Sequence, residues 1–102
     1  MNQQVMMRKL MKMKQEMEQT QQEIFDTEFR ASAGGVVEVV VMGTKELAEV
    51  IIDPDFEATT PEDLELLQDS IVAACNQAYK DIDDTTEEKM KKYAALTSGF
   101  GF

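Results

Sequence analysis

Hydrophobic positions near the start of the chain recur at helical spacing. The recurring positions, alternately four and three residues apart with one polar member, are Met6, Leu10, Met13, Met17, Thr20 and Ile24. This spacing places them along one face of a helix, in a stripe suited to a helix–helix seam. Gln, Glu and Lys fill most of the other positions and favour helix. The pattern therefore predicts a helix over residues 3–26.

The period changes from helical to alternating in the next part of the chain. Apolar and polar residues alternate over residues 27–33, and a Gly-Gly pair then indicates a turn. A run dense in valine over residues 36–42 is typical of a well-buried strand. Another turn precedes an apolar segment at residues 47–52. Because short connections favour antiparallel neighbours, we expect a three-stranded antiparallel meander within residues 27–53.

A strong helix start follows the strands. Thr60 is suited to cap a helix, Pro61 fits its first position, and acidic residues occupy the first turn, where the helix dipole favours them. No Gly or Pro interrupts the following segment, which predicts one helix over residues 61–97 and a loose tail at residues 98–102. The order of elements predicts an α+β fold in a single domain spanning residues 1–102.

The length of the last helix argues against a compact monomer. A helix over residues 61–96 would be about 54 Å long, whereas a compact globule of this size has a diameter below about 40 Å. A second copy of the chain would bury the exposed apolar stripe or pair the open sheet edges. We therefore expect a homodimer. The alternative is a kink near residues 81–84 that folds the helix back.

Charge is distributed unevenly along the chain. The formal net charge of −10 argues against nucleic acid as a partner when it is averaged over all residues. However, residues 1–14 hold four basic residues and no acids, residues 15–79 hold two basic residues against fifteen acids, and residues 80–102 hold four lysines against five acids. If the two helices pack side by side, their free ends would bring these basic terminal segments together. The candidate phosphate-binding residues are Arg8, Lys9, Lys12, Lys14, Lys89, Lys91 and Lys92.

These basic residues also have simpler explanations. A charged helix end is often only a solvated surface, and lysines near the end of the last helix balance its dipole. Cys75 is the only cysteine and the chain has no histidine, which argues against nucleophilic catalysis and against a zinc site. We expect Cys75 to be a structural, partly buried thiol. The sequence predicts no enzyme activity, no metal and no cofactor.

Several segments resemble the YbaB/EbfC family of bacterial nucleoid-associated proteins. They are the Met-, Gln- and Lys-rich opening at residues 10–17, the Gly-Gly pair with its valine-rich run at residues 34–43, the apolar segment ending in Asp-Pro at residues 50–54, and the helical segment at residues 64–78. The resemblance covers about residues 6–95. It implies a tweezer-shaped homodimer with helical arms that binds DNA.

Two functions are consistent with the sequence. The first is binding of duplex DNA with low specificity by the basic tips of helical arms, in a protein of the bacterial nucleoid. The alternative is an acidic adaptor that binds a basic protein partner, associated with DNA-processing machinery. The lone cysteine and the lack of a signal sequence predict a cytoplasmic protein. No segment approaches the roughly 20 apolar residues of a membrane span, so no membrane is expected as a partner.

Overall fold

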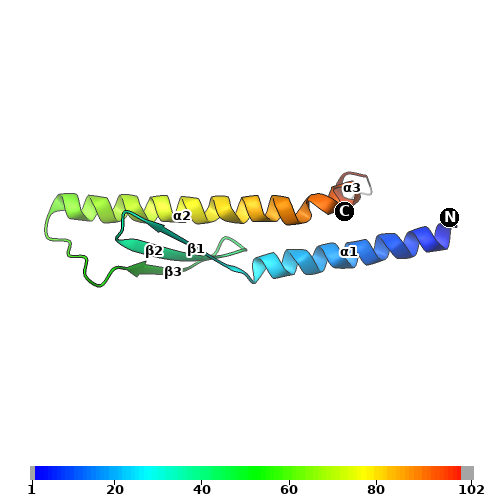
Figure 1. Cartoon of the computed structure of the whole chain (residues 1–102), viewed down its shortest axis with the longest axis horizontal. Coiled ribbons are helices and arrows are strands. Elements are labelled where there is room, and N and C mark those ends of the chain that lie inside the picture. The colour runs from blue at the N-terminus through cyan, green and yellow to red at the C-terminus, as the bar shows by residue number, and fades with distance from the viewer. Residues whose placement is uncertain (1, 100–102) are drawn as a thin grey trace.

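Two long helices and a three-stranded sheet form an elongated molecule in the computed structural model, which describes residues 2–99 (Figure 1). The molecule measures 72 × 20 × 16 Å. Helix α1 (Gln3–Phe25) leads into the sheet, and helix α2 (Pro61–Met90) lies over the sheet and continues past it beside α1 (Figure 1). A single copy of the chain is therefore a rod rather than a globule.

Helix α1 begins and ends close to the predicted limits. The side chain of Asn2 caps it by accepting a hydrogen bond of 2.8 Å from the backbone N–H of Val5. The helix ends at Phe25, one residue before the predicted limit, and the backbone N–H of Asp26 closes the last turn onto the carbonyl of Gln22. Ile24, the last member of the apolar stripe, is fully buried at the junction with the sheet.

The three predicted strands form the expected antiparallel meander. Strands β1 (Glu28–Ala33), β2 (Val37–Met42) and β3 (Leu47–Ile52) pair in the order β1-β2-β3. Gly34 and Gly35 both have positive φ, so the glycine pair allows the tight turn between the first two strands. This arrangement confirms the predicted α+β fold with its central meander.

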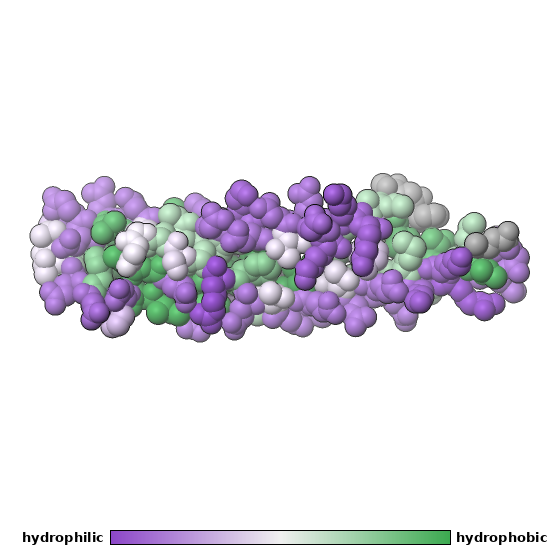
Figure 2. Space-filling model, in the orientation of Figure 1, coloured by the Kyte–Doolittle hydropathy of each residue, from purple (hydrophilic) through white to green (hydrophobic). Residues whose placement is uncertain are grey.

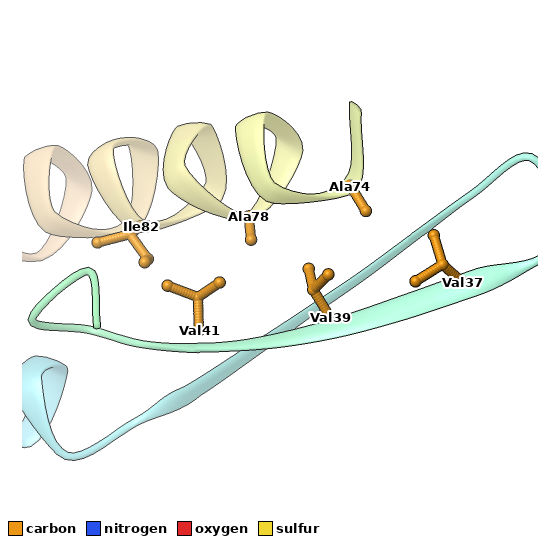
Figure 3. Packing of buried hydrophobic residues seen from close by; sticks show 6 residues of the cluster. All are labelled: Val37, Val39, Val41, Ala74, Ala78 and Ile82. Carbon is orange, nitrogen blue, oxygen red and sulfur yellow. The ribbon is translucent and has the colours of Figure 1, made fainter. Parts of the chain in front are cut away.

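The core lies between α2 and one face of the sheet. Alternate residues of β2, Val37, Val39 and Val41, point toward the helix. The facing residues of α2 are Ala74, Ala78 and Ile82, and all six side chains are buried (Figure 3). The small alanines allow the helix to approach the strand closely. Cys75 is half-buried against this cluster, as expected for a structural thiol.

Helix α2 has the predicted start but a different end. Thr60 and Asp63 form a capping box at its N-terminus. The expected single helix over residues 61–97 is wrong at its C-terminal end, since α2 stops at Met90 and is followed by the 3₁₀ turn η1 (Lys91–Tyr93) and helix α3 (Ala94–Gly99).

The segment after the break is anchored by buried side chains. Tyr93 of η1 and Leu96 of α3 are both buried. The alternative of a kink near residues 81–84 is also wrong, because α2 runs unbroken through them. Of the tail predicted to be loose, Ser98 and Gly99 belong to α3, and residues 100–102 lie outside the described part of the chain.

Candidate nucleic-acid interface

Helix α1 and the C-terminal end of α2 form an arm that extends away from the sheet (Figure 1). The hydroxyl groups of Thr20 in α1 and Tyr93 in η1 lie 3.4 Å apart and form a hydrogen bond between the two sides of the arm. Met90, at the end of α2, lines a hollow together with Met17 and Gln21 of α1. The C-terminal end of α2 is therefore level with the C-terminal half of α1, and the N-terminal end of α1 projects beyond it (Figure 1).

The first predicted basic group occupies this projecting end. Arg8, Lys9 and Lys12 are exposed, and Lys14 is half-buried. Arg8 and Lys12 are four residues apart and so share one side of the helix. Arg8, Lys9 and Lys12 form no ion pair with any other residue that the structure describes. Their charges therefore face solvent and remain free to attract an anion.

The second predicted basic group lies elsewhere on the arm. Lys89, Lys91 and Lys92 line a hollow beside residues 20–23 of α1, to which Glu23 and Glu88 also contribute. The Nζ atom of Lys92 lies 5.2 Å from the centre of the Tyr93 ring, within the range of a cation–π contact. Carboxylates are thus mixed with the cations here, unlike at the N-terminal end of α1.

The sequence had suggested that the two basic groups form one cluster. The structure instead separates them along the arm. Arg8 is twelve residues before Thr20, which corresponds to about 18 Å along the helix axis. The expected meeting of both groups at one tip is therefore corrected to two sites along the arm. The cause is the offset between the helices, because the first part of α2 covers the sheet and its end reaches only the C-terminal half of α1 (Figure 1).

Basic residues on the body of the molecule are engaged with carboxylates. Arg30 pairs with Glu38 at 3.0 Å and with Glu28 at 3.4 Å on the outer face of the sheet. Lys45 pairs with Asp83 at 2.7 Å, and Lys80 pairs with Asp84 at 2.8 Å. Hydrogen bonding to Asp84 raises the pKa of Lys80 above its ordinary value. These cations are already partly neutralised, unlike the exposed cations of α1.

Residues 2–99 give no support for a metal site or for a membrane-spanning helix. Within that range no group of three or more acidic, Cys or His side chains could hold a metal ion. The helices within the same range are also too short or too polar to cross a membrane.

The arm architecture is shared with known proteins. The model of the YbaB/EbfC DNA-binding family matches residues 1–97. The chain belongs to this family. Relatives include a nucleoid-associated protein of Clostridium novyi, 46% identical over 95 residues that make up 92% of this chain and 79% of that protein. A nucleoid-associated protein of Clostridium kluyveri is 42% identical over 95 residues, with the same coverage.

A solved structure supports the fold of this family member independently. The crystal structure of an uncharacterized protein from Helicobacter pylori is similar with a TM-score of 0.69 and 26% sequence identity. The similarity covers 91% of this chain and 97% of that chain. The resemblance inferred from the sequence is therefore confirmed, and so is the order of helix, meander and helix.

Sequence reasoning missed one feature of the arm. Met7 and Met11 are 53% and 60% exposed, although methionine usually packs against other apolar groups. Both residues fall outside the four-three spacing of the apolar stripe, which is the signal that could have revealed them. The candidate interface therefore combines cations with exposed thioether side chains.

Proposed function

We propose that this chain works as a homodimer that binds duplex DNA with low sequence specificity through its helical arms, as a component of the bacterial nucleoid. Phosphate groups are bound mainly by the basic residues near the N-terminus of α1, which are Arg8, Lys9, Lys12 and Lys14. A second, weaker contribution comes from the hollow at the end of α2, through Lys89, Lys91 and Lys92. The protein has no catalytic role in this proposal.

One observation carries the proposal. In a chain with a net charge of −10, the first fourteen residues contain four basic residues and no acid, and three of those cations are exposed without an ion-pair partner among the described residues. Duplex DNA carries one negative charge per about 1.7 Å of axis, so it is attracted to such an end and repelled by the acidic body. Family membership supports DNA as the partner.

An uncovered apolar surface supports the homodimer. Helix α2 packs mainly on β1 and β2, which leaves β3 at the edge of the sheet with all six residues exposed. Val50 and Ile52 pair with Val39 and Val37, so their side chains lie on the same face as the core residues but beyond the helix. Figure 2 shows apolar residues gathered over the sheet.

The proposal is tested by DNA binding measured over a range of salt concentrations. Replacing the three exposed cations in Arg8→Ala/Lys9→Ala/Lys12→Ala should weaken binding of a duplex at least tenfold and reduce the salt dependence. Each lost phosphate contact lowers the slope of log affinity against log salt by about 0.9. Fluorescence anisotropy with a labelled duplex provides the measurement, and light scattering confirms that the oligomeric state is unchanged.

The matched control is Arg30→Ala/Lys45→Ala/Lys80→Ala, which removes the same number of positive charges from the body of the molecule. Its affinity should change much less, because these residues are paired with carboxylates. Equal losses in both variants would mean that net charge alone governs binding and would refute the arm as the site. Absence of DNA binding by the wild type at low salt, together with nuclease-resistant binding of a basic protein, would support the adaptor function instead.

A further inference from the structure

The exposed methionines of α1 form a stripe that the apolar seam does not use. Successive residues of a helix are turned by about 100°, so Gln4, Met7 and Met11 lie along one side at spacings of three and four. This side is turned well away from the seam formed by Leu10, Met13 and Met17. We refer to Gln4, Met7 and Met11 as the thioether stripe.

Basic side chains lie along one border of the thioether stripe and at its C-terminal end. Arg8 and Lys12 each follow a methionine of the stripe and run along one border. Lys14, three residues after Met11 and seven after Met7, continues the line of the stripe toward the C-terminus. Gln3, Gln4, Met7 and Arg8 together line a shallow hollow on the projecting end of the helix. The pattern is a face of apolar and amide groups with a row of positive charge along one border.

We propose that the thioether stripe enters the major groove of duplex DNA and contacts base edges, in addition to the phosphate binding on which this inference rests. Met7 and Met11 pack against the C5-methyl groups of thymine, which are the apolar groups that the major groove presents. Gln4 donates to and accepts from the N7 and N6 positions of adenine, the pairing that an amide side chain favours. The result is a modest preference for A·T pairs within binding that phosphate contacts dominate.

The dimensions of the arm fit the major groove. A helix with its side chains is about 10–12 Å wide, and the major groove is about 12 Å wide. The N-terminal end of α1 projects beyond α2 and α3, so a single helix rather than a helix pair would enter the groove (Figure 1). Arg8 and Lys12 then face the phosphates on one wall while the stripe faces the floor.

Charge and the kind of exposed apolar side chain favour this occupant over others. Residues 1–14 contain no acid, which fits a polyanion beside the stripe. A helix that lies on a membrane surface presents large aromatic or leucine side chains, whereas the large apolar side chains exposed at this end are those of Met6, Met7 and Met11. A groove on another protein would not require exposed cations along the stripe.

The test compares two duplexes that differ only in the thymine methyl group. One contains thymine and the other contains deoxyuridine at the same positions, and both are titrated with wild-type protein and with Met7→Ala/Met11→Ala. The wild type should bind the thymine duplex about fourfold or more tightly, the change expected for burying one methyl group. The double variant should bind both duplexes equally. Alanine favours helix, and both methionines are exposed, so this variant should fold normally.

Val72→Ala is the control, because Val72 is a similarly exposed apolar residue, at 59%, on α2 away from the arm. It should discriminate between the duplexes as the wild type does. Equal binding of both duplexes by the wild type would overturn the proposed base contact while leaving phosphate binding intact. Discrimination that persists in the double variant would also overturn it, since the cause would then be duplex shape. Tighter binding of anionic phosphatidylglycerol vesicles than of DNA, lost in the double variant, would assign the stripe to membranes.

Discussion

Tyr93 and Thr20 are 73 residues apart in the sequence, yet their hydroxyl oxygens lie 3.4 Å apart between the two sides of the arm. Tyr93 is only 3% exposed, so its ring fills the space between α1 and the end of α2 while its hydroxyl finds a polar partner. This contact fixes how far along α1 the second basic group lies. Tyr93 therefore stabilises the packing of α1 against the chain that follows the end of α2.

Removing the Tyr93 hydroxyl and removing the ring should lower the free energy of unfolding by different amounts. Tyr93→Phe should lower the free energy of unfolding by about 1 kcal/mol, the typical value of one hydrogen bond. Tyr93→Ala should lower it by about 3–5 kcal/mol, because a buried aromatic side chain is lost. Urea denaturation at fixed protein concentration measures both values. A similar loss in the two variants would show that the hydroxyl, rather than the ring, provides the stability.

Gly43 lies at the junction between the end of α1 and the sheet, where two backbone segments approach closely. A Cβ atom at this position would overlap the carbonyl oxygen of Ile24 at the end of α1, and the Gly43 N–H donates a hydrogen bond of 2.9 Å to the carbonyl of Thr27. Gly43→Ala should therefore force the backbones apart and lower the free energy of unfolding by about 1–3 kcal/mol. Chemical denaturation provides the measurement.

Gly35→Ala is the comparison variant for Gly43→Ala. No atom lies within 4 Å of a Cβ at Gly35, but its φ is +70°. Only backbone strain should therefore oppose the change, at a cost of about 1 kcal/mol. The far-ultraviolet circular dichroism of Gly35→Ala should be unchanged. A smaller effect of Gly43→Ala than of Gly35→Ala would contradict the close contact with Ile24.

Asp63 should make the stability of α2 depend on acidic pH. The backbone N–H of Thr59, followed by the Thr60 and Thr59 side chains, holds the pKa of Asp63 below its ordinary value of 3.8. A lowered pKa in the folded state stabilises the protein above the ordinary value, and this contribution disappears as the pH falls through the folded-state pKa. Wild type should therefore exceed Asp63→Asn in stability near neutral pH, and the difference should shrink below about pH 4.

Thermal unfolding at several pH values tests this expectation. Glu62→Gln is the control, because it removes a carboxylate from the same first turn without breaking the capping box. Its stability relative to wild type should vary less with pH. A constant difference between wild type and Asp63→Asn at every pH would rule out ionisation of Asp63 as the source.

The lysines at the end of α2 should contribute less to DNA binding than those of α1. Glu23 and Glu88 line the same hollow, so their negative charges lower the positive electrostatic potential there. Lys89→Ala/Lys91→Ala/Lys92→Ala should weaken binding of a duplex a few-fold, with a smaller change in salt slope than Arg8→Ala/Lys9→Ala/Lys12→Ala. Anisotropy titrations compare the two triple variants. A larger loss in the α2 variant would shift the main site to the hollow.

The sequence predicted the elements of the fold well because local chemistry determines them. The valine-dense run over residues 36–42 identified the buried strand. Thr60 and Pro61 identified the start of α2 to the residue. These signals depend on residues close together in the chain, so no tertiary information was needed to find them.

The sequence did not predict features that depend on contacts between distant segments. The break after Met90 has no Gly or Pro to mark it, and the burial of Tyr93 and Leu96 beyond it is a tertiary feature. The separation of the two basic groups depends on the offset between α1 and α2, which hydrophobic spacing does not encode.

The uncovered strand β3 makes a prediction about assembly. Val50 and Ile52 are 40% and 43% exposed on the face that carries the core, so burying them against a second copy would remove apolar surface from water. Val50→Lys/Ile52→Lys should convert a dimer into monomers, because two unpaired charges would be buried at the interface. Light scattering coupled to size-exclusion chromatography measures the mass directly. Met11→Lys, an apolar-to-basic change at a residue 60% exposed on the arm, should leave the mass unchanged. A double variant that remains dimeric would place the interface away from β3, and a monomeric wild type would refute the homodimer itself.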